Sequence, residues 1–265
     1  MERRRTPRFR YSKDITPILE GWEYVPNEIS VRRIRGLDGR DKIQLRIDLG
    51  LMQMELDGRP DGLRPHGKES LLDYFESVLL DHLDRFGTDK HFRLTEEDLA
   101  NLQREALQYY HRYISLLHLG DYDRVVRDTE RNLRLFDFVA RYAPTEEDKW
   151  AFNQYRPYVL TVRARAKSLG ALEQKDYDAA LAAIREARSL IEAFYREMGT
   201  EEELTESSEL ETLREWEAQI EKERPLSLRE RLTRELEEAI RREEYERAAK
   251  IRDQLRNLDR TDEVR

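Results

Sequence analysis

The sequence predicts a mainly α-helical protein with a small N-terminal antiparallel β element and a C-terminal helical hairpin. From Lys68 onward, apolar residues recur at steps of three and four, which is the period of an amphipathic helix. Between residues 29 and 56, apolar and polar residues alternate, as they do in a half-buried strand. Charged residues make up 39% of the chain and hydrophobic residues 38%, a balance that suits helices with one buried and one charged face.

The composition excludes several classes of site. The chain of 265 residues contains no cysteine, so disulfides, thiolate zinc sites and cysteine nucleophiles are excluded. Its net charge of −8 argues against a general nucleic-acid binder. No apolar run approaches the roughly 20 residues that span a bilayer, and no apolar core follows the basic start MERRRTPRFR to make a secretory signal. We therefore expect a cytoplasmic protein.

Residues 1–28 are predicted to be an irregular, basic arm. Five arginines lie in the first ten residues, and Pro7, Pro17 and Pro26 interrupt any helix. Such an arm is usually a solvated tail, and the alternative is that it contacts an anionic partner.

Residues 29–67 are predicted to hold the β element and a glycine-rich loop. Ile43, Leu45, Ile47 and Leu49 would share one face of a strand. Asp38-Gly39 predicts a hairpin with a two-residue type I′ turn, in which both central residues have positive φ. The alternation shifts phase after Gly50, which indicates a bulge or a second turn and so two or three strands in total.

The loop from Asp57 to Gly67, DGRPDGLRPHG, is long for its connection. Loops rich in glycine with charged side chains can hold a ligand, and the candidates here are Arg59, Asp61 and His66. The alternative is a chain of tight turns that leads into a helix.

Residues 68–224 are predicted to be an α-helical domain. The first helix ends at Gly87, and Thr95 and Thr145 each begin a capping-box pattern. Pro157 should break or kink the chain. Later helices are expected at 158–174, 177–198 and 201–223.

Two short acidic turns in this region have nearly the same sequence. Gly120-Asp121-Tyr122-Asp123 and Lys175-Asp176-Tyr177-Asp178 each lie between two helical segments and precede small apolar residues. The acid before each tyrosine can cap the second helix, and the ring can pack back over the turn. These junctions resemble those of tetratricopeptide (TPR) repeats over residues 106–195.

The two turns are 55 residues apart instead of 34, with an insertion near residues 143–157. Two interpretations therefore stay open. The hairpins either present a concave face that binds protein segments or simply pack together as a bundle.

A third turn of this kind lies in the stretch Ser227 to Leu258. Apolar residues line one face of each of two short helices, and the turn between them carries Glu244 and Tyr245. This stretch resembles the UVR motif of the excision-repair proteins UvrB and UvrC. The chain is also similar to bacterial UVR-motif proteins that share the segments Gln44–Met54 and Gly58–Gly62.

The UVR resemblance implies that residues 225–265 bind another protein, because the UvrB hairpin joins a like hairpin of UvrC. The alternative is that the hairpin caps the helical domain of its own chain. The residues that the resemblance places at the contact are Tyr245, Ala248, Ala249, Arg252, Asp253 and Leu255.

The sequence offers no candidate catalytic residues, cofactor or metal site. Phosphate-binding, dinucleotide-binding and zinc-protease motifs are absent. His111 and His118 stand seven residues apart on one predicted helix, and about 10 Å is too far for one metal without other ligands.

We therefore predict a non-enzymatic adaptor whose partner is a repair protein or a stress-response protease or kinase, with a homo-oligomer as a further option. The alternative is a ligand-binding or nucleic-acid-binding protein that uses the N-terminal strands, the GRPDG loop and the arginine-rich arm.

Overall fold

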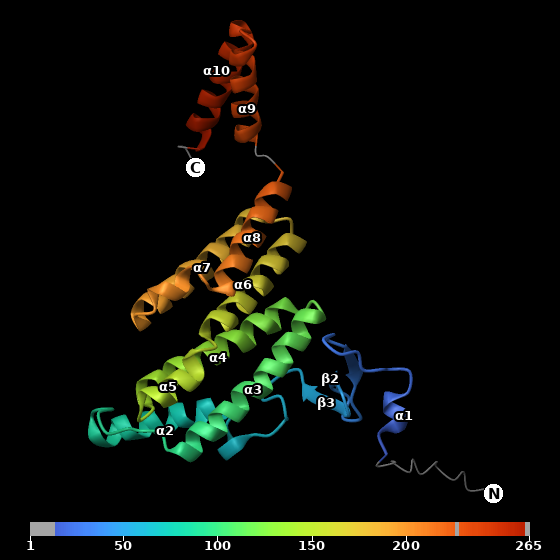
Figure 1. Ribbon diagram of the computed structural model, residues 1–265, viewed down its shortest axis with the longest axis vertical. Helices are drawn as coiled ribbons and strands as arrows, with labels where there is room; N and C mark the ends of the chain where they lie inside the picture. The colour runs from blue at the N-terminus through green and yellow to red at the C-terminus, as the bar shows by residue number, and fades with distance from the viewer. Residues whose placement is uncertain (1–13, 226–227, 263–265) are drawn as a thin grey trace, which may run out of the picture. The chain divides into compact units, whose positions relative to one another are not determined.

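The structure, a computed structural model, describes residues 14–225 and 228–262 (Figure 1). The chain forms two compact units, residues 1–214 and 215–265, which are described separately. Residues 1–13 of the predicted basic arm, with all five of its N-terminal arginines, lie outside the described ranges. Its described part is irregular except for the short helix α1 (Thr16–Leu19).

The β element is a three-stranded antiparallel sheet in the order β1-β2-β3 (Val31–Arg35, Asp41–Ile47 and Gly50–Glu55). The phase shift at Gly50 is a second turn, since Ile47 pairs with Gly50 across Asp48 and Leu49. Leu49 lies in that turn and is 91% exposed, so it does not extend the buried face as predicted.

The predicted two-residue turn at Asp38-Gly39 is wrong. Arg35 pairs with Asp41, which leaves a five-residue connection, 36–40, between β1 and β2. Within it only Gly39 has positive φ, at 76°. The Asp38 carboxylate accepts a hydrogen bond from the Arg40 amide (3.1 Å), and Gly36 N donates to Arg40 O (2.7 Å). These local hydrogen bonds satisfy polar backbone groups of the five-residue connection, so the hairpin does not require a type I′ turn.

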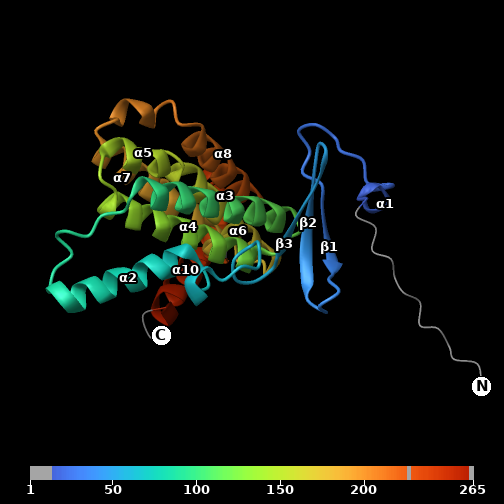
Figure 2. The same cartoon turned by 90° about the horizontal axis from the view of Figure 1, so that it is seen from below.

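The sheet packs against the helices through its buried face (Figure 2). Ile43, Leu45 and Met54 form one core cluster with Tyr113 and Leu116. Because these two helical residues are near the end of α3, the sheet covers the end of the first helical hairpin.

The helices begin and end largely where the capping signals predicted. Thr95 and Thr145 each accept a hydrogen bond from the amide three residues on, and Gly87 ends α2 in the left-handed conformation. Pro157 lies in the first turn of α6, where it begins a helix and does not kink one. The helices of this region are α2 (Leu71–Phe86), α3 (Glu96–His118), α4 (Tyr122–Tyr142), α5 (Glu146–Asn153), α6 (Arg156–Glu173), α7 (Tyr177–Met198) and α8 (Ser208–Glu223).

The predicted continuous helix over 201–223 is wrong. A 3-10 turn covers Glu201–Leu204, and α8 starts only at Ser208. The hydroxyl of Ser207 accepts a hydrogen bond from the Leu210 amide (3.3 Å), which provides a new N-terminal cap at that point.

Two helical hairpins, α3–α4 and α6–α7, form the body of the domain, and α4 packs against α6. The predicted insertion near 143–157 contains the short helix α5, which lies against α4.

All three repeated turns share one backbone motif. In each, a left-handed residue follows the first helix, its amide bonds back three residues, and the next amide bonds back five residues. This is the Schellman motif, which satisfies the last carbonyls of a helix. The left-handed residues are Gly120, Lys175 and Glu243, with φ of 73°, 60° and 59°.

In the first two turns, the acid that follows the left-handed residue has a different role in each. Asp176 accepts a hydrogen bond from Ala179 N (2.9 Å) and caps α7 as predicted. Asp121 makes no such cap; its carboxylate pairs with Arg33 (2.8 Å) of β1 and Arg124 (3.0 Å). The turn between α3 and α4 is therefore tied to the sheet.

Candidate functional site

The C-terminal unit contains a hairpin of α9 (Leu228–Arg241) and α10 (Tyr245–Asp262). Its two helices meet along an apolar hairpin seam. Ala239 and Ile251 are 1% and 5% exposed, and the small side chain at 239 allows the helices to approach closely. The hairpin seam consists of Leu232, Leu236, Ala239, Ala248, Ile251 and Leu255.

The structure divides the predicted contact residues between the hairpin seam and the surface. Ala248 is 7% exposed and Leu255 is partly buried, so both pack inside the hairpin. Tyr245 is 68% exposed at the turn. Arg252 pairs with its neighbour Asp253 (3.2 Å) on the surface of α10.

Ala249, the remaining predicted contact residue, is partly exposed. The predicted motif residue Leu258 lies outside the residues whose side chains are described. Ile240, which was not among the predicted contact residues, is 54% exposed just before the turn. The end of the hairpin that carries the turn therefore presents two large apolar side chains, at 240 and 245.

The loop predicted to hold a ligand is docked on α3. Arg59 pairs with Asp61 (3.2 Å) and with Glu105 (3.4 Å). Asp61 also accepts a hydrogen bond from Gln108 (3.1 Å). His66 stacks on the Tyr74 ring with 3.9 Å between ring centroids. Arg59 and Asp61 thus lie together against Gln108 of α3, whereas His66 lies against α2, so the three predicted side chains do not all meet at one site.

Beneath this loop lies a buried charge network that the sequence analysis missed. Glu105 is fully buried, accepts hydrogen bonds from Leu71 N (2.8 Å) and Leu72 N (3.3 Å), and pairs with Arg131. It thereby caps α2 from α3. Burial lowers the pKa of Arg131 to about 9, so its guanidinium stays protonated at neutral pH.

Arg112 and Asp128 form the second half of the network. Arg112 Nε and Nη2 donate to the two Asp128 oxygens (2.6 and 2.8 Å), and Nη1 donates to the carbonyls of Glu55 (3.0 Å) and Gly58 (2.7 Å). Burial raises the pKa of Tyr109, whose ring lies under the Arg112 guanidinium, to about 12. The network joins the strand end, the loop and two helices.

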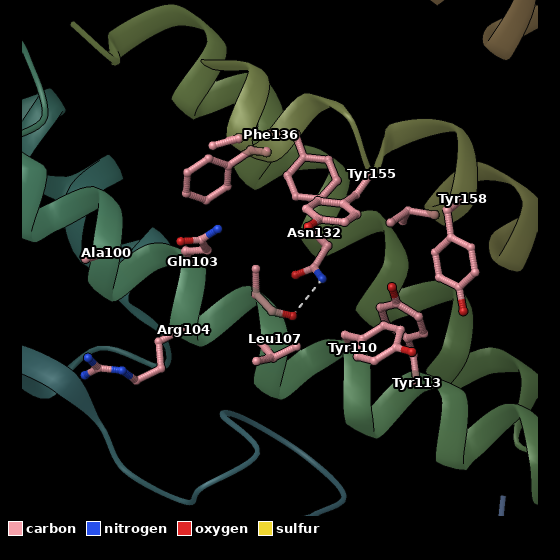
Figure 3. Close-up of a pocket in the computed structure, with 14 residues that line it drawn as sticks. Ala100, Gln103, Arg104, Leu107, Tyr110, Tyr113, Asn132, Phe136, Tyr155 and Tyr158 are labelled. Carbon is pink, nitrogen blue, oxygen red and sulfur yellow. Dashed lines mark hydrogen bonds between the residues drawn. The ribbon is translucent and has the colours of Figure 1, made fainter. Parts of the chain in front are cut away.

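A cavity of about 690 Å³ opens between α3, α4, α5 and α6 (Figure 3). We call it the aromatic groove, because six rings are among its lining residues. Asn132 donates to the carbonyl of Ala106 (3.1 Å) on its inner wall, and Arg104 lies near one end. The rings are Tyr110, Tyr113, Phe136, Phe152, Tyr155 and Tyr158.

The aromatic groove has a buried floor and an exposed rim. Phe136 and Phe152 are each 3% exposed, whereas Tyr155 is 52% and Tyr158 38% exposed. Burial, together with the nearby Tyr110, raises the pKa of Tyr158 to about 12. The phenol therefore stays neutral at physiological pH, and the groove is large enough for an organic ligand or part of a peptide.

Within the described ranges, no three histidine or acidic side chains lie close enough together to hold a metal ion. The described helices also include none that is long and apolar enough to cross a bilayer.

The comparison with protein families agrees with the helical geometry at the C-terminus. The family described as the UvrB/uvrC motif, or UVR, matches residues 227–261. The chain carries a UVR motif. The match confirms the predicted resemblance and includes α9, α10 and the turn between them, which we now call the UVR hairpin. Such motifs typically mediate protein–protein interactions in repair proteins. No curated protein and no solved structure matches the chain.

Proposed function

We propose that this protein is a non-enzymatic adaptor that binds another protein through its UVR hairpin. The observation that carries the proposal is the UVR motif at residues 227–261, folded as a two-helix hairpin. In repair proteins this motif typically serves protein–protein contact. The partner would be another UVR-containing or repair protein, or a component of stress-response proteolysis.

The packing of the UVR hairpin supports a role in binding. Among its described side chains, the core consists of four buried ones with two partly buried ones beside them. Such a small apolar area offsets little of the entropy lost on ordering two helices. Ile240 and Tyr245 remain exposed, and covering them with a partner would remove further apolar surface from water.

The contact surface we propose differs from the one that the motif alone predicted. Ala248 and Leu255 hold the hairpin together, and Tyr245 is the predicted residue best placed to touch a partner. Arg252 and Asp253 are exposed and pair with each other, so we expect them to contribute little to affinity.

The proposal is tested by affinity capture from a bacterial lysate with the full chain as bait. Ile240→Gln and Tyr245→Gln should each deplete the captured partners, because each removes an exposed apolar anchor without disturbing the hairpin seam. Lys250→Gln, a change at an exposed position of α10, is the matched control and should leave the partners unchanged. Circular dichroism checks that all three variants keep their helix content.

Mass in solution, measured in parallel, distinguishes a foreign partner from a second copy of the chain. If deletion of residues 226–265 changes neither the captured proteins nor the solution mass, the adaptor proposal is wrong.

The alternative of ligand or nucleic-acid binding at the N-terminal strands has less support. Arg59 and Asp61 are engaged with each other and with α3, so the GRPDG loop does not offer them together to a ligand.

A further inference from the structure

The aromatic groove presents apolar side chains to solvent along one face of α3. Leu107 is 53% exposed, and it lies opposite Tyr155 and Tyr158, which are 52% and 38% exposed (Figure 3). An amphipathic helix of a soluble domain normally exposes polar residues on its outer face. Apolar surface gathered in one concave region instead marks a binding site.

The length of the groove favours a polypeptide as its occupant. The lining residues extend along α3 from Ala100 to Tyr113. At 1.5 Å per residue this stretch is about 20 Å long, which matches about four turns of a helix. A compact small molecule would cover only part of it.

The walls of the groove favour a helix over an extended strand. Its lining residues come from α3, α4, α5 and α6, and the backbone groups within a helix are already hydrogen-bonded. An extended segment would find no free strand edge to pair with. A bound helix needs only side-chain contacts, with anchors at i, i+3, i+4 and i+7.

The charge of the groove favours an acidic occupant. Of the described residues that line it, Arg104 alone is charged. Among the described residues, no carboxylate lies within 4 Å of this guanidinium, and its hydrogen bond goes to the neutral Asn101 at 3.5 Å. The basic segment MERRRTPRFR of the same chain would be repelled.

We propose that the aromatic groove binds an amphipathic helix of another protein, with apolar anchors among the six rings and an acidic residue at Arg104. This inference rests on the proposed adaptor function and adds a second docking site to it. The bound helix would cover Leu107, Tyr155 and Tyr158, and the acidic residue would set its orientation along α3.

The test uses the full chain and a displayed library of helical peptides of about sixteen residues with randomised charges around an i, i+3, i+4, i+7 apolar face. We expect the enriched peptides to carry Asp or Glu near one end. Arg104→Glu should weaken them about tenfold, since it replaces an attraction with a repulsion. It should strengthen versions of the same peptides in which Lys replaces the acid.

Leu107→Lys should abolish binding, because it places a charge against the apolar face of the peptide. The matched control is Leu80→Lys on α2. Leu80 is 61% exposed and does not line the groove, so this variant should bind like the unaltered chain. Thermal unfolding of each variant establishes that it is folded before binding is measured.

Three outcomes would overturn the inference: no enrichment above that obtained with Leu107→Lys, enrichment of basic or extended peptides, or affinity that Arg104→Glu leaves unchanged. Leu107→Lys is also used as bait in the lysate capture. If the unaltered chain enriches no peptide while Leu107→Lys keeps the partners that depend on the UVR hairpin, the groove proposal fails and the adaptor proposal stands.

Discussion

Replacing Asp128 by Asn should destabilise the helical unit by about 3 kcal/mol. Asp128 and Arg112 each have a side chain that is 1% exposed, and they are joined by two hydrogen bonds. The substitution keeps the shape of the side chain but leaves the guanidinium without its negative partner. Losing one member of a buried pair costs about 3–5 kcal/mol. We expect the lower end, because the carbonyls of Glu55 and Gly58 still accept hydrogen bonds from Arg112.

The assay is urea unfolding at neutral pH. Because the chain has two compact units that can unfold separately, the helical unit is followed by tryptophan fluorescence in a Trp216→Phe background. The matched control is Asp41→Asn, which breaks an exposed pair with Arg35 (2.8 Å) and should cost at most about 1 kcal/mol. A loss for Asp128→Asn no larger than that of the control would refute the reasoning, since it would mean that Arg112 is not held by a desolvated charge.

Three further predictions concern local features of the helical unit. Asp176→Ala should cost about 1 kcal/mol of stability in urea unfolding and Asp176→Asn much less, because an asparagine can still cap α7; equal losses would show that the cap is unimportant. Gly120→Ala should cost about 1 kcal/mol by the same measurement, since it places a side chain at φ 73°, whereas Lys175→Ala at the equivalent turn should be nearly neutral. Burial lowers the pKa of His111 below its usual 6.5, so the folded chain binds fewer protons than the unfolded chain, and stability should fall as the pH drops through 6.5 toward the lowered pKa. His111→Gln should reduce that fall in urea midpoints measured between about pH 7 and about pH 5, and an unchanged pH profile would argue against it.

The helices could be predicted because their signals are local. Thr95, Thr145 and Gly87 satisfy backbone groups within a few residues of themselves. The sequence alone is therefore enough to place these helix ends. The turn at Asp38-Gly39 could not be predicted in the same way. Two residues there suited a type I′ turn, but the register is set by the pairing of Arg35 with Asp41 across the sheet.

The buried charge network could not be predicted from charge pattern alone, because charges on helices are usually solvated. A weaker signal was present. Glu105 and Arg112 fall on the same stripe of α3 as the buried Leu102, Tyr109 and Leu116, so they occupy core positions. Polar residues at core positions require partners. What the sequence does not show is that the partners come from α4 and the GRPDG loop.

The aromatic groove could not be predicted because it contains rings that the sequence suggests are buried and that the structure exposes. Tyr110, Tyr155 and Tyr158 resemble ordinary core residues in the sequence, where apolar positions at helical spacing are expected to be buried. Two of these rings are exposed: Tyr155 lies in the turn between α5 and α6, and Tyr158 lies in the first turn of α6. That exposure depends on how three helices are arranged, which periodicity within one helix does not encode.

The three similar turns show where local resemblance ends. Each combines a left-handed residue, an acid and a tyrosine, and each forms the same Schellman motif. Yet Asp176 caps its helix, Asp121 binds the sheet, and Tyr245 lies exposed in the UVR hairpin. The repeated sequence therefore specifies how the chain reverses between helices. Binding must be set by the surroundings of each turn, which is why the exposed end of the UVR hairpin and the aromatic groove, and not the turn sequence itself, carry the functional proposals.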